Sequence, residues 1–344
     1  MSADVTVLWA LRSPCNLGCR YCYFGTLEEH RTSPPSAPGQ LSHLSRADVS
    51  LADITAFAAS LPGSAVQRIF IAGGEPLIWP PVLSVLEAIK AAGVEAVVCT
   101  NGIPLTRPGI IDGLLRIAID AVSVSLDSAT PEHNDTWRPA HNGTGSWHQA
   151  VSGIRALIAA RGTATSPAVG IYTVVTARNI SAITSVATLA RDLGCDYFVP
   201  QPLSLPPGHI LDAQLSLIPA HARQLAAQFT NLYATAGLRL PAADYPDQVL
   251  RSVTQAGPGL VAGCFGGRHL FFIEPDGSVW PCPSSYKIAS LAGSAIGSIR
   301  GATAAGLFGG GGPCADCALF TRDCVNMWPL TQFTSMITGT ELRP

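Results

Sequence analysis

Short apolar runs alternate with helical segments through residues 1–200, and this alternation limits the folds open to the chain. The runs are the length of strands, and the segments between them have the spacing of amphipathic helices, as in Pro81–Ala92, which stops at Gly93. Strands separated by helices pair in parallel through right-handed crossovers. The sequence therefore predicts an α/β fold around a parallel sheet, with strands at Val5–Leu11, Gln67–Ala72, Glu95–Cys99, Ala121–Leu126, Val169–Val175 and Tyr197–Pro200.

Three cysteines follow the first expected strand. Cys15, Cys19 and Cys22 are separated by three and two residues, with aromatic Tyr21 before the third. A four-iron cluster normally takes four thiolates, so three would leave one iron open to a substrate or cofactor. Structural zinc sites are closed at four ligands, and no fourth Cys or nearby His completes this triplet locally. A zinc site and plain burial of the thiols both remain alternatives on spacing alone.

Composition excludes several classes of partner. The 344 residues are 47% hydrophobic and 13% charged, which is enough apolar material for a large globular core. The net charge is -2, with no basic run, so neither nucleic acid nor an anionic membrane surface is an expected partner. Without a secretory leader or a long apolar run, we expect a cytoplasmic protein. Ten cysteines in that reducing compartment favour metal ligands or reactive thiols over disulfides.

Beyond residue 200 the alternation ends. Two helices are expected near Pro219–Ala236 and Pro246–Gln255. The turn Glu274–Gly277 then separates two short apolar runs, His269–Ile273 and Ser278–Trp280, and its Asp-Gly step suits a tight β-hairpin turn. The sequence therefore predicts a second, smaller unit after the sheet.

The motifs at the strand ends resemble those of a known family. The cysteine triplet after the first strand, Gly73-Gly74-Glu75-Pro76 after the second and Ser125-Leu126-Asp127 after the fourth look like a radical S-adenosylmethionine (SAM) enzyme. The later part, with Cys264, Gly277, Cys282, Cys314 and Cys317, resembles the auxiliary-cluster extension called SPASM or twitch. The resemblance covers Val5 to Cys324. It implies a partial (β/α)6 TIM-like barrel with a small C-terminal β-hairpin/loop domain holding an auxiliary iron–sulfur cluster.

The resemblance also implies a division of the chain. Residues 1–200 would form the barrel core, and residues 201–262 a helical bridging region. Residues 263–330 would form the auxiliary-cluster domain, followed by a C-terminal tail at 331–344.

In the family, an open iron binds SAM, and one electron from the [4Fe–4S] cluster cleaves it to a 5′-deoxyadenosyl radical. That radical takes a hydrogen atom from an unreactive C–H bond. The resemblance assigns the cluster to Cys15, Cys19 and Cys22. Glu75 and the Gly73-Gly74 backbone would meet the SAM amino group, Ser125 the ribose and Arg138 the methionyl carboxylate. The full set of expected cofactor-binding residues is Tyr21, Gly73, Gly74, Glu75, Pro76, Asn101, Ser125, Asp127 and Arg138.

The later cysteines supply a second set of ligands. The resemblance implies one auxiliary [4Fe–4S] cluster, held by Cys264, Cys282, Cys314 and Cys317. Cys324 is a spare or alternative ligand. Trp328 stands where the full SPASM pattern has a further cysteine, so a second auxiliary cluster is disfavoured.

Two thiols stand outside both sets. Cys99 and Cys195 lie on expected strands in apolar surroundings, which is typical of buried cysteines. The alternative is a hydrogen-atom donor that quenches a product radical.

The expected function is oxidative maturation of a ribosomally made peptide, by a cross-link, a thioether or a dehydrogenation. Only Met1 to Asp4 precede the first strand, so we expect either a separate leader-peptide-binding protein or a small substrate. The alternative is a dehydrogenase or epimerase of a sugar or aminocyclitol, and a more remote one is a non-catalytic metal or electron-carrier protein. An external electron donor of the flavodoxin or ferredoxin type is implied.

Overall fold

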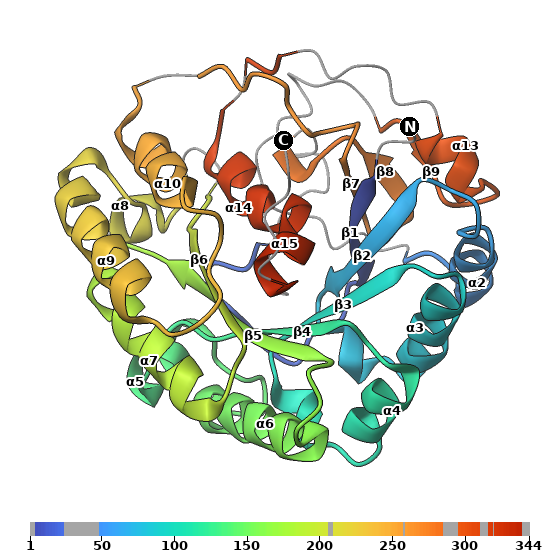
Figure 1. The fold of residues 1–344 in the computed structure, drawn as a ribbon, viewed down its shortest axis with the longest axis horizontal. Coiled ribbons are helices and arrows are strands. Elements are labelled where there is room, and N and C mark those ends of the chain that lie inside the picture. Colours follow the sequence, from blue (N-terminus) through green and yellow to red (C-terminus); the bar gives the residue numbers. More distant parts are fainter. Residues whose placement is uncertain are drawn as a thin grey trace.

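A single nine-stranded sheet organises the described part of the chain (Figure 1). The computed structural model describes residues 4–23, 48–205, 209–256, 259–284, 295–309, 316–318 and 320–338. Cys314 lies outside these residues. The strands are β1 (Val5–Arg12), β2 (Val66–Gly73), β3 (Glu95–Thr100), β4 (Ala121–Ser125), β5 (Ala168–Val175), β6 (Tyr197–Pro202), β7 (Leu270–Ile273), β8 (Ser278–Trp280) and β9 (Gly297–Ser298).

The first six strands pair in parallel in chain order, and β7 continues the sheet by pairing in parallel with the other side of β1. In this register Leu8 lies opposite Phe70 on one side and Phe272 on the other. Because consecutive parallel strands require crossovers, a helix or helical turn follows each of β2 to β5. The sheet curves into a partial barrel, and the predicted α/β fold is confirmed.

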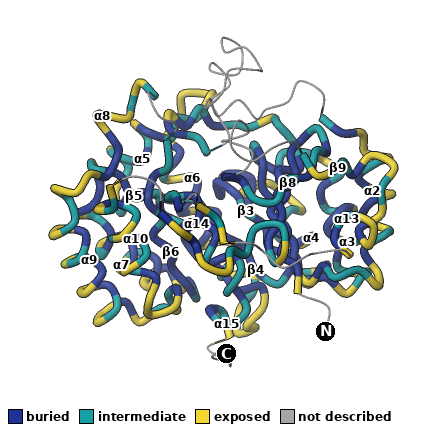
Figure 2. The backbone as a smooth tube through the Cα atoms, turned by 90° about the horizontal axis from the view of Figure 1, so that it is seen from above, coloured by how far each residue is buried: buried dark blue, intermediate teal, exposed yellow. Residues whose placement is uncertain are grey.

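Helices cover the outer face of the barrel. The helix α2 (Leu51–Ala59) packs against β1 through the edge-on interaction of Phe57 with Trp9, whose ring centroids are 5.4 Å apart. Figure 2 shows buried strands inside and exposed segments along the outer helices. These helices include α2 (Leu51–Ala59), α3 (Val82–Ala91), α4 (Ile110–Ile117), α5 (Pro131–Trp137), α6 (Ser146–Arg161), α7 (Ile183–Leu193), α9 (Ala222–Thr235) and α10 (Tyr245–Thr254).

Two helices near the C-terminus, α14 (Arg322–Thr331) and α15 (Phe333–Thr338), occupy the open side of the barrel (Figure 1). Met327 and Phe333 belong to the same buried cluster as Leu8 and Phe70 on the inner face of the strands. The Phe70 and Phe333 rings meet edge to face with centroids 5.0 Å apart. The two helices therefore pack against the inner face of the barrel strands.

The expected hairpin is confirmed. β7 and β8 pair antiparallel, and β9 adds to β8 in the same sense. The turn closes through a hydrogen bond from Gly277 N to Glu274 O of 2.9 Å, with Gly277 at φ +88°, a conformation that favours glycine. Among the described helices, none has the length and hydropathy to span a membrane.

Candidate active site

A pocket of about 220 Å³ opens at the carboxyl ends of the barrel strands. Binding sites of parallel α/β folds lie at this edge. The cysteine loop, the strand ends and α14 all contribute to its wall. The residues expected from the sequence that line it are Cys15, Cys19, Tyr21, Cys22, Gly73, Gly74, Asn101, Ser125 and Arg138.

The cysteine loop, which carries Cys15, Cys19 and Cys22, is fixed by backbone hydrogen bonds to the last residue of α5 and to the segment after it. Gly18 N donates to Pro139 O at 2.8 Å, and Arg20 N donates to Trp137 O at 2.9 Å. Leu17 N points inward, to the sulfur of Cys15 at 3.4 Å. The loop therefore holds its thiols toward the pocket without regular secondary structure of its own.

Gly73 and Gly74 allow β2 to end against the start of this loop. A Cβ on Gly74 would lie 2.1 Å from the backbone oxygen of Pro14, and one on Gly73 would lie 2.5 Å from that of Arg12. Gly73 also has φ +126°. The two glycines are thus required by backbone packing next to the cysteine loop, and they leave their own backbone exposed to the pocket.

Glu75 stands behind the pocket wall and ties two strand ends together. Its carboxylate accepts hydrogen bonds from Leu77 N at 3.0 Å, Thr100 Oγ1 at 2.9 Å and Asn101 N at 2.6 Å. The side chain is buried, and burial raises the pKa of Glu75 to about 7 against the lowering effect of these donors. Glu75 therefore fixes Asn101, whose amide lines the pocket and donates to Asn16 Oδ1 at 2.7 Å.

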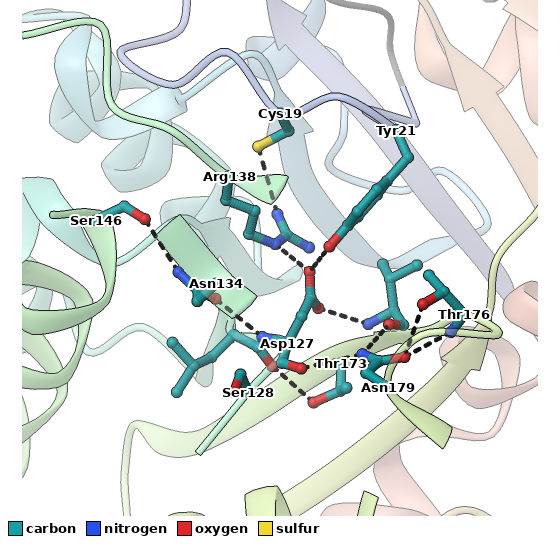
Figure 3. Close-up of polar contacts among 12 residues, drawn as sticks. Cys19, Tyr21, Asp127, Ser128, Asn134, Arg138, Ser146, Thr173, Thr176 and Asn179 are labelled. Atoms are coloured by element: carbon teal, nitrogen blue, oxygen red, sulfur yellow. Dashed lines mark hydrogen bonds and ion pairs between the residues drawn. The ribbon is translucent and has the colours of Figure 1, made fainter. Parts of the chain in front are cut away.

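Asp127 is the centre of a buried polar network at the end of β4 (Figure 3). Its fully buried carboxylate accepts from the Tyr21 phenol, from Arg138 Nε and from Val174 N. The backbone N–H of Asp127 donates to Asn134 Oδ1 at 3.1 Å. Asp127 thus orients Tyr21 and Arg138, both of which line the pocket, while its own side chain stays behind them.

Nitrogen donors approach two of the three sulfurs. Arg138 Nη1 lies 3.7 Å from Cys19 Sγ, and Asn101 Nδ2 lies 4.0 Å from Cys15 Sγ. Burial raises the pKa of both thiols, so they are protonated in the metal-free chain. Donors of this kind stabilise thiolate once a metal replaces the proton.

The later cysteines come together at a separate place. Cys264 and Cys282 flank Gly266, whose N–H donates to Cys264 Sγ at 3.4 Å. Burial raises the pKa of Cys264 to about 12, and the charges of Cys317, Cys282 and Cys324 add to this increase. Cys324, on α14, is therefore one of three thiols close enough to Cys264 to act on its pKa.

Comparison with known proteins identifies the family. The model of the radical SAM superfamily matches residues 14–187, which is half of the chain. The chain belongs to the radical SAM superfamily. Mycofactocin maturase MftC of Mycobacterium tuberculosis is 29% identical over 299 residues, covering 86% of this chain and 68% of the relative. AdoMet-dependent heme synthase of Methanosarcina barkeri is 26% identical over 295 residues, covering 82% and 77%.

Solved structures share the radical SAM fold. Native anSMEcpe with bound AdoMet superposes with a TM-score of 0.63 at 17% identity, covering 97% of this chain and 98% of that one. SuiB of Streptococcus suis gives a TM-score of 0.62 at 14% identity, covering 96% and 67%. At these identities the likeness establishes the fold.

A radical SAM enzyme uses a [4Fe–4S] cluster and SAM, and the residues present fit both groups. Three thiols line one pocket with nitrogen donors near two of them, and the adjacent glycine backbone leaves room for a ligand. Within the described ranges, no three His, Cys, Asp or Glu side chains gather closely enough to bind one metal ion. A tetrahedral zinc site would need each sulfur about 2.3 Å from a single point.

The radical SAM pocket also contains residues that sequence reasoning missed. Glu75, Pro76 and Asp127 were expected to contact the cofactor, but in the structure they do not line the pocket. Tyr172, Gln201 and Asn326 line it instead, together with Cys99. The alternation of inward-facing residues along β5 and β6 indicates the first two. No local signal identifies Asn326, because its position depends on the entry of α14 into the barrel.

Proposed function

We propose that this radical SAM enzyme carries out oxidative maturation of a ribosomally synthesised peptide. The observation that carries the proposal is the meeting of three thiols, the Gly73-Gly74 backbone and Arg138 in one pocket with a partly apolar wall. The relatives named maturase and the solved complex of SuiB with its precursor peptide SuiA support a peptide substrate.

The residues of the chain have distinct roles in this proposal. Cys15, Cys19 and Cys22 hold the cluster, which with SAM supplies the 5′-deoxyadenosyl radical that abstracts hydrogen from the substrate. The Gly73-Gly74 backbone receives the SAM amino group, and Ser125 receives the ribose. Arg138 presents its outer nitrogens to the methionyl carboxylate, because its Nε is already engaged by Asp127.

A second metal site completes the proposed chemistry. Oxidative maturation removes one more electron from the substrate after hydrogen abstraction, so an acceptor must lie nearby. We assign this role to one auxiliary [4Fe–4S] cluster held by Cys264, Cys282, Cys314 and Cys317. The electrostatic effect of Cys324 on Cys264 supports Cys324 as the alternative ligand. A flavodoxin-like or ferredoxin-like donor and a separate leader-binding protein are proposed partners.

A direct test uses the anaerobically reconstituted chain with iron, sulfide, dithionite and SAM. We expect 5′-deoxyadenosine, detected by liquid chromatography and mass spectrometry, and its loss in Cys19→Ala. No 5′-deoxyadenosine under reducing conditions would contradict the enzyme assignment. The mass of a peptide encoded beside this gene should fall by about 2 Da for each two-electron oxidation. Conversion of a sugar and of no peptide would instead favour the sugar dehydrogenase or epimerase.

A further inference from the structure

Two buried polar atoms in the active-site pocket belong to residues with no part in holding the cluster or SAM. They are the hydroxyl of Tyr172 on β5 and Oδ1 of Asn326 on α14. Neither atom has a hydrogen-bond partner among the described residues. A buried polar group without a hydrogen-bond partner destabilises a folded protein. Both residues line the same pocket, so a bound molecule there can supply the missing partners.

Asn326 is held so that it presents an acceptor. Its Nδ2 donates to Pro202 O at 3.0 Å, and its backbone oxygen accepts from Gln201 Nε2 at 3.2 Å. A flipped amide would turn Oδ1 toward the carbonyl of Pro202, so the bond fixes which atom is oxygen. The residue is only 6% exposed. The partner it lacks is therefore a hydrogen-bond donor.

Tyr172 lies beside a second buried tyrosine, Tyr197, whose hydroxyl has a hydrogen-bond partner. The Tyr197 ring lies edge-on to it with centroids 6.3 Å apart, and the Tyr197 hydroxyl is paired with Ser123 Oγ at 2.8 Å. Burial raises the pKa of Tyr172 well above its usual value, so its hydroxyl keeps its proton. Tyr172 can therefore donate to a ligand oxygen.

Much of the wall around Tyr172 is apolar. Leu8, Phe70, Met327 and Leu330 line the pocket with it. A sugar ring would bury hydroxyl groups against these side chains without partners. A peptide unit with an aliphatic side chain offers one N–H, one carbonyl and an apolar group, which matches this wall.

We propose that Asn326 and Tyr172 form the substrate subsite of the enzyme, in which Asn326 Oδ1 accepts a peptide N–H and the Tyr172 hydroxyl donates to a peptide carbonyl. This inference rests on the proposed function and specifies how its substrate is recognised. The subsite joins the barrel wall to α14, so the peptide would bind between β5, β6 and the C-terminal helix.

The test measures binding to the full chain loaded with iron, sulfide and SAM but left unreduced, so that no turnover occurs. The probes are N-acetyl-L-leucine methylamide and methyl α-D-glucopyranoside, each titrated by saturation-transfer NMR. We expect the capped leucine to bind and the glucoside to bind at least fivefold more weakly. Tyr172→Phe should weaken capped-leucine binding by about three- to tenfold, the effect of one neutral hydrogen bond.

Unfolding temperature separates recognition from structure. Tyr172→Phe removes a hydroxyl without a described partner, so its Tm should be equal to or above that of the unmodified chain. Tyr197→Phe is the matched control. It loses the hydrogen bond to Ser123, so it should lower Tm without weakening binding of the capped leucine. Asn326→Leu should lower Tm and abolish probe binding.

Three results would overturn the subsite. The first is equal binding of the capped leucine to Tyr172→Phe and to the unmodified chain, and the second is preference for the glucoside. The third is a lower Tm for Tyr172→Phe, which would mean that the hydroxyl already has a partner in the free protein. Formation of 5′-deoxyadenosine is measured separately on the reduced protein. Its absence contradicts the proposed function, whereas its presence with any of these three results contradicts the subsite alone.

Discussion

The phenol of Tyr21 donates a hydrogen bond to the carboxylate of Asp127, and this bond connects the cysteine loop to the end of β4. Arg138 binds the same carboxylate and extends to Cys19 Sγ. Asp127 is completely buried, so the cysteine loop, the end of β4 and the end of α5 all depend on one carboxylate (Figure 3).

Asp127→Asn should strongly destabilise the chain. Removing one member of a buried ion pair leaves the other charge unpaired and costs about 3–5 kcal/mol. The Arg138 side chain is only 11% exposed, so solvent cannot replace the lost partner. Urea unfolding of the metal-free variant measures the change in the free energy of unfolding. The double variant Asp127→Asn/Arg138→Met should recover part of the loss.

The control for Asp127→Asn is Glu87→Gln, which breaks the exposed ion pair between Glu87 and Arg116. Exposed pairs contribute less than about 1 kcal/mol. Similar unfolding free energies for Asp127→Asn and Glu87→Gln would show that the network around Asp127 does not hold the loop.

Gly74→Ala should displace the cysteine loop, because the added Cβ would meet the Pro14 backbone oxygen at 2.1 Å. Both atoms belong to backbone, so the clash cannot be relieved by a side-chain rotation. We expect a loss of more than about 2 kcal/mol in stability and incomplete binding of iron. Gly93→Ala is the control, since Gly93 has φ +78° but open space around its Cβ position. It should cost about 1 kcal/mol and keep all of its iron.

Local sequence patterns predicted the barrel strands and the hairpin because both depend on neighbouring residues. The apolar runs mark β1 to β6, and the Asp-Gly step marks the turn at Gly277. By contrast, α14 and α15 were not predicted, because α14 carries Asn326 and Pro329 within its span and is buried through contacts with distant strands. The packing that buries α14 is thus a property of the tertiary structure.

The site shows the same division between local and distant signals. The spacing of Cys15, Cys19 and Cys22 indicates ligands without any structural knowledge. The motifs that contain Glu75 and Asp127 lie at strand ends beside the pocket, but their carboxylates bind protein groups and do not line it. Their partners Thr100 and Arg138 lie on other elements, and no spacing rule identifies them as partners of these two carboxylates.

Glu75→Gln should destabilise the chain in a pH-dependent way. Glutamine has only one acceptor oxygen. Its amide nitrogen would therefore face either the Asn101 N–H or the two donors Leu77 N and Thr100 Oγ1. The lost hydrogen bonds should cost about 1–3 kcal/mol in the free energy of unfolding. Because burial raises the pKa of Glu75 to about 7 from 4.5, the folded chain binds its proton more tightly than the unfolded chain. The stability from that proton is present below pH 4.5 and is lost as the pH rises through 7.

Urea unfolding at pH 5, 6, 7 and 8 checks this sign. The unmodified chain should lose stability relative to Glu75→Gln as the pH rises from 5 to 7, by about 3 kcal/mol at most. Glu87→Gln, at an exposed position, should show no such trend. A pH-independent difference for Glu75→Gln would mean that its carboxylate titrates normally in the folded chain.

Cysteine substitutions should divide the bound iron into two separable groups. Cys15→Ala should remove about four irons per chain, because a cluster with only two protein ligands is not retained. Cys264→Ala should remove about four others and leave SAM cleavage measurable, since Cys264 lies among the later cysteines. Cys195→Ala is the matched control, a buried thiol packed in the core, and it should keep all of the iron. Iron and sulfide analysis after anaerobic reconstitution gives the counts.

Retention of the second group of irons in Cys314→Ala, with its loss in Cys324→Ala, would reassign the fourth auxiliary ligand to Cys324. An unchanged count in Cys15→Ala would contradict the cluster assignment itself.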